Sequence, residues 1–124
     1  MNVPEKLLEI LNQDGVVAIA SMGKDAPHMV NSWNSYLRVT PDGRLLIPVG
    51  AMHQTEANVA LNRQVLVSMG SSKVPGKHGP GTGYLVKGEA VFITSGPDFD
   101  VVKARFGWAR ATLAITIQSA TQTL

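Results

Sequence analysis

The segment VNSWNSYLRVTPDGRLLIPVG, residues 30–50, decides the fold class of this chain. It divides at Pro41-Asp42-Gly43 into two short runs, and these three residue types together are typical of a tight turn. Two runs of strand length around such a turn predict a β-hairpin. Because a hairpin joins antiparallel strands, the segment predicts a protein built on antiparallel β-structure.

The first of these runs, residues 30–39, does not alternate as a strand normally does. A half-buried strand places apolar and polar side chains on opposite faces. Between Asn31 and Tyr36, however, both faces carry amides, hydroxyls or aromatic rings, whereas Leu37 and Val39 fit an ordinary strand. We therefore expect the first half of this run to contact a ligand and the second half to be structural.

The rest of the chain completes a mainly β protein with short flanking helices. The first predicted helix ends at Asp14-Gly15, a pair that stops helices. Six strands in one chain of this length predict an antiparallel barrel, closed or partly closed, in a single domain over residues 1–124. The elements predicted beside the hairpin are helices at 4–13 and 53–62, a helix opening at Pro97, and strands at 16–21, 65–69, 84–94 (with a bulge at Gly88) and 111–118.

The composition excludes several classes of protein. Of the 124 residues 16% are charged and the formal net charge is +2, so the basic surface that nucleic-acid binding requires is absent. The lack of cysteine excludes disulfide bonds, thiolate metal sites and thiol catalysis. No apolar run reaches the length of a membrane span, and the N-terminal segment does not read as a signal peptide. We expect a soluble, cytoplasmic protein with neither a nucleic acid nor a membrane as partner.

The sequence predicts neither catalytic residues nor a metal site. Its three histidines, His28, His53 and His78, are far apart in the sequence, and no pair of carboxylates stands out for acid–base chemistry. The glycine-rich segment at residues 70–83 precedes a strand and lacks the glycine spacing of known nucleotide-binding loops. We interpret it as a loop that is flexible or covered by a partner, packed across a subunit interface, or in contact with phosphate.

The helix predicted at 53–62 begins beside residues that suit a phosphate group. Helix N-termini expose unpaired amides and the positive end of the helix dipole, and both attract anions. Gly50 precedes this helix, and the hydroxyl of Thr55 lies in or near its first turn. Plain helix capping by Thr55 is the alternative interpretation.

The aromatic residues suggest what such a phosphate could be attached to. Trp33 and Trp108 lie beside polar or small residues, and together with Tyr36 they are either core residues or the walls of a site for a flat ligand. A planar molecule with hydrogen-bonding edges and a phosphate tail would use all of these features. Flavin mononucleotide (FMN) has that shape, and its pyrimidine edge would suit the polar groups of Asn31 to Asn34.

Several motifs also resemble a known family. GVVAIA, HMVNSWNSYL, VGAMHQTEANVA, GPGTG, FGWARA and SATQTL are similar to the small FMN-binding flavoproteins of sulfate-reducing bacteria, minimal members of the pyridoxamine-phosphate-oxidase-like split-barrel family. The resemblance covers essentially the whole chain. It implies a six-stranded antiparallel Greek-key split barrel that forms a homodimer and holds one FMN per subunit near the interface. It also implies an electron carrier with an unidentified redox partner protein.

The resemblance further implies which residues bind the cofactor. The strand from Val30 to Tyr36 would meet the flavin ring and the segment from Gly50 to Thr55 would receive the phosphate. Trp108 would lie near the ring, and Leu124 would reach over from the partner subunit. The complete set of expected cofactor-binding residues is Val30, Asn31, Ser32, Trp33, Asn34, Tyr36, Val49, Gly50, Ala51, Met52, Gln54, Thr55, Trp108 and Leu124.

One position departs from the family pattern, which has a lysine where this chain has Gln54. Glutamine donates hydrogen bonds but not the stronger, charge-assisted kind. Either Lys73 or Arg63 compensates, or backbone amides suffice, or the affinity for FMN is lower. Two other functions stay open at this point: a small flavin reductase or oxidase that uses NAD(P)H or an amine, and a module that binds heme or another tetrapyrrole.

Overall fold

A computed structural model describes residues 3–124, so the first two residues of the expected domain lie outside the described residues. The described chain folds into three helices, one 3-10 turn and seven strands. The elements are α1 (Glu5–Leu11), β1 (Val16–Met22), β2 (Pro27–Trp33), the turn η1 (Asn34–Tyr36), β3 (Arg38–Val39), β4 (Arg44–Val49), α2 (His53–Leu61), β5 (Gln64–Pro75), β6 (Pro80–Ile93), α3 (Pro97–Arg105) and β7 (Ala111–Gln122). The prediction of a mainly β fold with short helices is confirmed.

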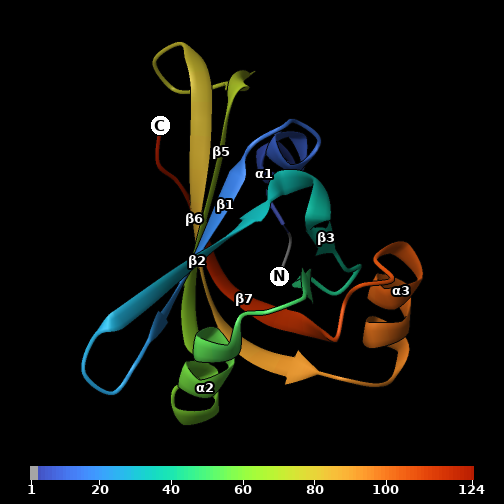
Figure 1. Cartoon of the computed structure of the whole chain (residues 1–124). Helices are drawn as coiled ribbons and strands as arrows, with labels where there is room; N and C mark the ends of the chain where they lie inside the picture. Colours follow the sequence, from blue (N-terminus) through green and yellow to red (C-terminus); the bar gives the residue numbers. More distant parts are fainter. Residues whose placement is uncertain (1–2) are drawn as a thin grey trace.

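The strands form one antiparallel sheet in the order β2-β1-β5-β6-β7-β4-β3. β5, β6 and β7 are neighbours in the sheet as well as in the sequence, and β4 returns to lie beside β7, which is a Greek-key order. Figure 1 shows the sheet strongly curved, with α1, α2 and α3 on separate sides of it. The hairpin predicted around Pro41-Asp42-Gly43 is present, since Arg38 and Val39 pair with Leu46 and Leu45.

The two edge strands of the sheet, β2 and β3, follow each other in the sequence and are joined by η1. The sheet therefore curls until its edges meet at this connection, although β2 does not pair with β3 among the strand pairs of residues 3–124. We call the connecting residues 34–37 the seam. The run 30–39, predicted as one strand, is thus two strands and a turn, which explains both its poor alternation and the count of seven strands instead of six.

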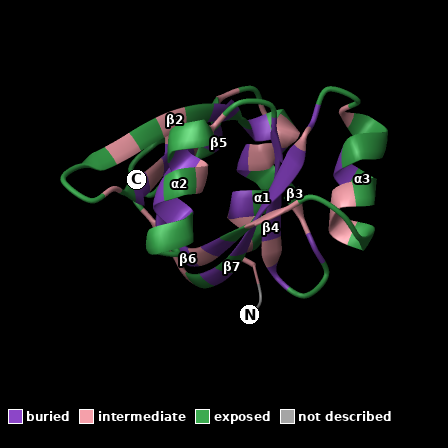
Figure 2. Ribbon diagram, turned by 60° about the horizontal axis from the view of Figure 1, so that its bottom comes forward, coloured by how far each residue is buried: buried purple, intermediate pink, exposed green. Residues whose placement is uncertain are grey.

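The inner face of the curved sheet and α1 enclose the main core. Leu7 and Ile10 of α1 are fully buried there. β4 is buried along almost its whole length because both of its faces are covered: Ile47 lies in the main core, whereas Leu46 contacts Val102 of α3 in a second, smaller core. Figure 2 shows this contrast between the buried strands and the largely exposed α3.

The glycine-rich segment at 70–83 is not a loop for most of its length. β5 extends to Pro75 and β6 begins at Pro80, so only the tip at residues 76–79 is a turn. Glycine is needed here because a Cβ on Gly76 would lie 2.2 Å from the carbonyl oxygen of Gly81 on the facing strand. By contrast, the bulge predicted at Gly88 is confirmed by a register shift between Lys87 and Gly88 in the pairing of β6 with β7.

In the described part of the chain, no helix is both long enough and apolar enough to cross a membrane. Residues 3–124 also contain no cluster of three or more histidines or carboxylates placed to hold a metal ion.

Candidate functional site

The connection from β4 to α2 leaves the first amides of α2 without a side-chain cap. Met52, at the N-cap position of α2, adopts the left-handed conformation with φ 58°, which is unusual for a residue other than glycine. No side chain caps the helix. Thr55 in its first turn is fully buried, and within residues 3–124 its hydroxyl has no hydrogen-bond partner. Because buried hydroxyls are nearly always paired, this oxygen suggests a ligand at the helix start.

Arg110, immediately before β7, holds this connection in place. Its guanidinium donates to the carbonyl of Gly50 (Nε, 3.0 Å) and to that of Ala51 (Nη2, 2.6 Å). Its backbone amide donates to the carbonyl of Val49, the last residue of β4. Nη2 also forms an ion pair with Glu56 of α2 at 3.0 Å. The positive charge nearest the start of α2 is therefore already paired with a carboxylate.

Three aromatic rings form a cluster beside the same connection. The ring centroids of Tyr36 and Trp108 lie 5.9 Å apart, and Phe106 contacts both, at 4.9 Å from Tyr36 and 5.5 Å from Trp108. The Trp108 indole packs on Gly50, where an added Cβ would come within 3.3 Å of two ring atoms. Because 53% of Trp108 is exposed, the cluster reaches the surface right beside the loop before α2.

The residues of β2 divide between the two faces of the sheet. Ser32 is buried and Val30 half-buried on the inner side, where α2 also packs. Asn31 and Trp33 point outward, and Trp33 is 52% exposed. Within the described chain, Trp33 does not belong to the cluster of Tyr36, Phe106 and Trp108.

Asn34 has a structural role that the sequence did not predict, and its expected contact with a ligand stays a prediction. It is fully buried in the seam, and the two hydrogens of its Nδ2 are shared among the carbonyls of Ile10 (3.2 Å), Gln13 (3.1 Å) and Gly70 (3.1 Å), whereas its Oδ1 has no partner within residues 3–124. Its backbone amide donates to the carbonyl of Gly15. This side chain therefore ties the end of α1, the seam and β5 together, and its amide nitrogen is not free for a ligand.

Gln54 is exposed in the first turn of α2, but its side chain is engaged within the helix. Its Nε2 donates to Oδ1 of Asn58 at 2.8 Å, and Asn58 in turn donates to Ser21 of β1. The two cations predicted to compensate for Gln54 are elsewhere in the same chain. Arg63 follows the opposite end of α2 and pairs with Glu89, and Lys73 lies near the far end of β5.

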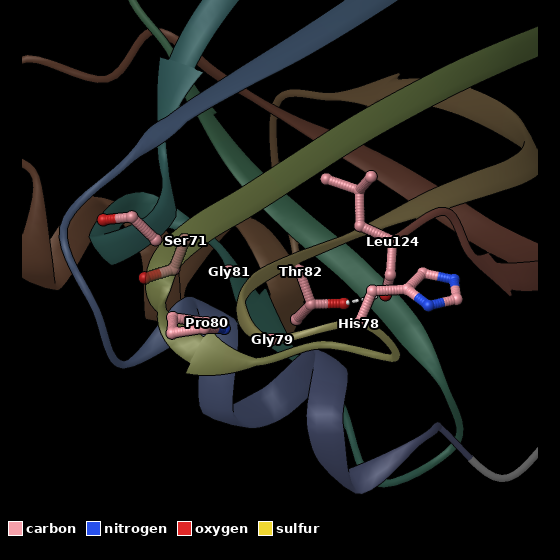
Figure 3. Close-up of a pocket in the computed structure, with 8 residues that line it drawn as sticks. Ser71, His78, Gly79, Pro80, Gly81, Thr82 and Leu124 are labelled. Carbon is pink, nitrogen blue, oxygen red and sulfur yellow. Dashed lines mark hydrogen bonds between the residues drawn. The ribbon is translucent and has the colours of Figure 1, made fainter.

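Leu124 lies apart from the other predicted site residues within one chain. Its carbonyl accepts hydrogen bonds from the Thr82 hydroxyl and from the amide of Lys77 at the tip of the β5–β6 hairpin. Figure 3 shows this Leu124 side chain beside a cavity of about 460 Å³ that the hairpin lines. In Figure 1 the C-terminus and α2 lie on opposite sides of the molecule, so Leu124 does not border the start of α2 in its own chain.

The structure therefore brings together part of the predicted set. Trp108 packs on Gly50 in the connection formed by Val49, Gly50, Ala51 and Met52, and the ring of Tyr36 lies beside that of Trp108. The start of α2 continues from this connection. Sequence reasoning missed two participants, Phe106 and Arg110. Both lie in the motif FGWARA, but their contacts are with residues far away in the sequence, such as Gly50, which is 60 positions from Arg110.

This arrangement has the chemistry of a receptor for an anion joined to an aromatic ring. An uncapped helix start offers amide donors, and a buried hydroxyl lies within its first turn. Beside them stands a wall of aromatic rings that can stack on a planar group. The hydroxyl of Thr55 is shielded from solvent, so a ligand oxygen that reaches it must displace the atoms that cover it.

Comparison with protein families and curated sequences gives one consistent answer. Residues 3–122 match the family described as pyridoxamine 5'-phosphate oxidase. The chain is also 56% identical, over 122 residues, to the FMN-binding protein of Nitratidesulfovibrio vulgaris (strain DSM 19637 / Miyazaki F). That alignment covers 98% of this chain and 99% of the relative.

Solved structures share the fold at much lower identity. An FMN-binding protein from Syntrophomonas wolfei superposes with a TM-score of 0.75 at 15% identity, over 97% of this chain and 85% of that protein. HupZ of Group A Streptococcus superposes with a TM-score of 0.77 at 16% identity, over 98% and 94% of the two chains. At such identities these structures establish the fold alone. The predicted split-barrel fold is thereby confirmed.

Proposed function

The chain belongs to the pyridoxamine 5'-phosphate oxidase family, and from that premise we propose that it binds FMN and passes electrons to or from a partner protein. Its relative with 56% identity is an FMN-binding protein, and the two chains align over almost their full lengths. The observation that carries the proposal is the contact of Trp108 with Gly50. It places an exposed aromatic wall directly beside an uncapped helix start.

The residues present fit the two ends of FMN. The amides at the start of α2 and the unpaired hydroxyl of Thr55 suit the phosphate. Tyr36 and Trp108 suit the flavin ring, and Val30 with Ser32 on the inner side of β2 would border it. The outward residues Asn31 and Trp33 and the distant Leu124 are assigned to the side of the ring that faces a second subunit, and these assignments stay predictions.

When bound, FMN supplies one- and two-electron redox chemistry that the side chains of this protein cannot provide. The protein's own contribution is to bind, orient and partly cover the ring. Trp108 belongs to a connected set of rings that reaches the surface, so it borders both the site and the solvent from which a partner protein would approach.

The first experiment is a titration of the flavin-free protein with FMN, followed by the fluorescence of the flavin. We expect saturable binding with strong quenching, because tryptophan and tyrosine next to a flavin quench its emission by electron transfer. A protein that binds neither FMN nor heme would contradict the proposed function. The absorption spectrum of the purified protein also distinguishes bound FMN from bound heme, since the two absorb at different wavelengths.

Two buried threonines form a matched pair for locating the phosphate. Thr55 and Thr112 are both fully buried with unpaired hydroxyls within residues 3–124, but only Thr55 lies at the start of α2. We expect Thr55→Val to weaken FMN binding about tenfold, the scale of one lost hydrogen bond to a charged group. Thr112→Val removes an equivalent hydroxyl on β7, opposite Pro48 and not in the first turn of α2, so we expect this variant to bind FMN as tightly as the wild type. If both substitutions weakened FMN binding equally, the phosphate would not contact Thr55.

The enzymatic alternative needs a separate test. The FMN-loaded protein is mixed anaerobically with excess NADH or NADPH, and the flavin absorbance is followed. A carrier that receives its electrons from a protein keeps its colour over minutes under these conditions. Rapid bleaching would replace the carrier proposal with that of a flavin reductase.

A second copy of the chain is the proposed partner on the outer face of the sheet. Opposite residues of paired strands share a face, and the register places Met29, Ala20 and Leu66 in one row across β2, β1 and β5. Trp33 pairs with Val16 two rows away on the same face, with Ala18 and Asn31 in the row between. Met29, Leu66, Trp33 and Val16 are apolar and at least 42% exposed. A dimer through this face would bury them and would place Trp33 at the subunit interface.

A further inference from the structure

The contacts of Arg110 suggest how the site distinguishes phosphorylated from unphosphorylated flavin. We propose that Arg110 is a positioning residue: by holding the carbonyls of Val49, Gly50 and Ala51, it turns the amides of the same connection toward the phosphate of FMN. This inference rests on the proposed function, because it concerns the same site. It differs from attraction by charge, since the guanidinium acts through the backbone.

The first step of the argument is that one residue engages three successive carbonyls. The backbone amide of Arg110 donates to Val49, Nε donates to Gly50 at 3.0 Å, and Nη2 donates to Ala51 at 2.6 Å. The next carbonyl, that of Met52, accepts the first hydrogen bond of α2 from the amide of Glu56. All four carbonyls between the end of β4 and the start of α2 therefore have a partner.

The second step follows from the geometry of the peptide bond. In a trans peptide the C=O of one residue and the N–H of the next point in roughly opposite directions, and the described chain contains no cis peptide bonds. Fixing the carbonyls of Val49, Gly50 and Ala51 thus directs the amides of Gly50, Ala51 and Met52 away from Arg110. Outside the regular helix and strand ladders of residues 3–124, none of these three amides donates a hydrogen bond.

The third step concerns the charge of Arg110. Glu56 pairs with Nη2 at 3.0 Å, and the two side chains are 32% and 38% exposed. The opposite charges of Arg110 and Glu56 largely offset each other at the site. The amide dipoles and the start of α2 are then the main attraction for an anion. The left-handed backbone of Met52 completes the turn from the strand into the helix. Phosphate recognition without the usual lysine at position 54 then has a physical basis.

The test compares the affinities for FMN and for riboflavin, which has the same ring and no phosphate. For the wild type we expect FMN to bind more tightly. In Arg110→Met we expect the ratio of the two affinities to fall about tenfold, the equivalent of about one hydrogen bond to an anion, with riboflavin affinity nearly unchanged. Equal weakening of both flavins would show a merely structural role and would overturn the inference.

Lys103→Met is the matched control. Lys103 also uses its side chain to bind backbone carbonyls, those of Gly107 and Ala109, in the same connection between α3 and β7. It does not contact the loop before α2. We expect this variant to keep the wild-type preference for FMN. Loss of the preference in both variants would mean that general loosening of the connection is the cause, and would also overturn the inference.

Amide NMR spectra separate positioning from charge. In the flavin-free Arg110→Met protein, the signals of Gly50, Ala51 and Met52 should move or broaden, because their peptide planes are released. If they stay in place while the preference for FMN falls, Arg110 acts by charge and the inference is wrong. Should Arg110→Met not fold, Arg110→Lys takes its place. It keeps the charge but not the paired hold on the carbonyls of Gly50 and Ala51, so the preference for FMN must still fall, and an unchanged preference would overturn the inference.

These outcomes also separate the inference from the proposed function. A wild-type protein that binds neither flavin contradicts the proposed function itself. If the wild type prefers FMN and the Arg110→Met variant prefers it by the same factor, only the role of Arg110 is contradicted.

Discussion

At the scale of single residues, Asn34 has the largest structural role of the polar side chains in the seam. Its Nδ2 lies within hydrogen-bonding distance of three backbone carbonyls from α1, the loop after it, and β5. Burying a carbonyl without a hydrogen-bond donor costs free energy, because its hydrogen bonds to water are lost and not replaced. Asn34 therefore holds the curled sheet closed where its edge strands do not pair.

We predict that Asn34→Ala lowers the free energy of unfolding by roughly 3 kcal/mol, the scale of losing several buried hydrogen bonds. Chemical denaturation followed by circular dichroism measures this change. Asn31→Ala is the control, because Asn31 is exposed on the same segment and makes one long hydrogen bond, to Val17. A denaturation midpoint for Asn34→Ala equal to that of the control would contradict the structural role of Asn34.

Gln54 offers a second prediction at this scale. Gln54→Lys should raise the affinity for FMN about three- to tenfold, because an ammonium group near the start of α2 adds a charge-assisted interaction with phosphate. The same change removes the hydrogen bond to Asn58 and should cost about 1 kcal/mol of stability. Fluorescence titration and thermal unfolding measure the two effects.

The control for net charge is Gln118→Lys. Gln118 is exposed on β7 and contacts Glu89, which pairs with Arg63 beyond the opposite end of α2 from Gln54. If both lysines raised FMN affinity equally, the gain would come from the overall charge of the protein and Gln54 would not lie near the phosphate.

Single residues were the hardest part of the site to predict from the sequence. The structural hydrogen bonds of Asn34 could not be predicted, because its partners are 21 to 36 positions away. Arg110 was missed for the same reason, since its carbonyl partners are 59 and 60 positions away. Side-chain bonds to a distant backbone leave no periodicity in a sequence. Of the three aromatic residues grouped from the sequence, Tyr36 and Trp108 do lie together, but Trp33 does not join them.

At the scale of elements, local signals predicted most of the fold. Turn residues located the β3–β4 hairpin, and Gly88 located the bulge between β6 and β7. The two elements that differed depend on tertiary contacts. The run 30–39 breaks at Trp33 because the sheet ends there, and the glycines at 70–83 permit close strand pairing rather than a loose loop. Glycine is common both in loops and where strands pair closely, so the composition of this segment does not distinguish the two.

The β3–β4 turn also determines how α3 is attached. Arg44, the first residue of β4, pairs with Asp42 in the turn at 3.0 Å and with Asp98 in the first turn of α3 at 2.5 Å. A hydrogen bond from Thr40 and a second from Arg44 hold the pKa of Asp42 below its ordinary value of 3.8. The ion pairs thus connect a hairpin and a helix that are 54 residues apart in the chain.

This attachment predicts a dependence of stability on pH. A carboxyl group whose pKa is lowered by folding stabilises the native state above its unfolded pKa, and this stabilisation is lost as the pH falls through the folded value. The wild type should therefore unfold at a higher temperature than Asp42→Asn at pH 6, and the difference should shrink below about pH 4. Thermal unfolding from pH 3 to 7 measures it. A difference that stays constant over this range would show that the charge of Asp42 does not contribute.

At the scale of the whole molecule, the outer face of the sheet predicts the oligomeric state. Met29 and Trp33 of β2 expose 64% and 52% of their surface, and Leu66 of β5, on the other side of β1, exposes 42%. Large apolar side chains exposed on one face of a sheet indicate a site of association, and a symmetric second copy of the chain would cover them. In a two-fold dimer each substitution on this face occurs twice, so a charge introduced there is buried twice.

We predict that the FMN-loaded wild type sediments as a dimer and that Leu66→Lys sediments as a monomer at the same concentration. Burying two lysines in an apolar interface should cost several kcal/mol, which raises the dissociation constant more than 100-fold. Leu61→Lys is the control, because Leu61 is 79% exposed on α2 and lies outside this face. Dissociation caused by both lysines, or by neither, would place the interface elsewhere. If the wild type itself bound FMN as a monomer, the contact of Leu124 with the flavin of a partner subunit would also be wrong, since Leu124 lies far from α2 in its own chain.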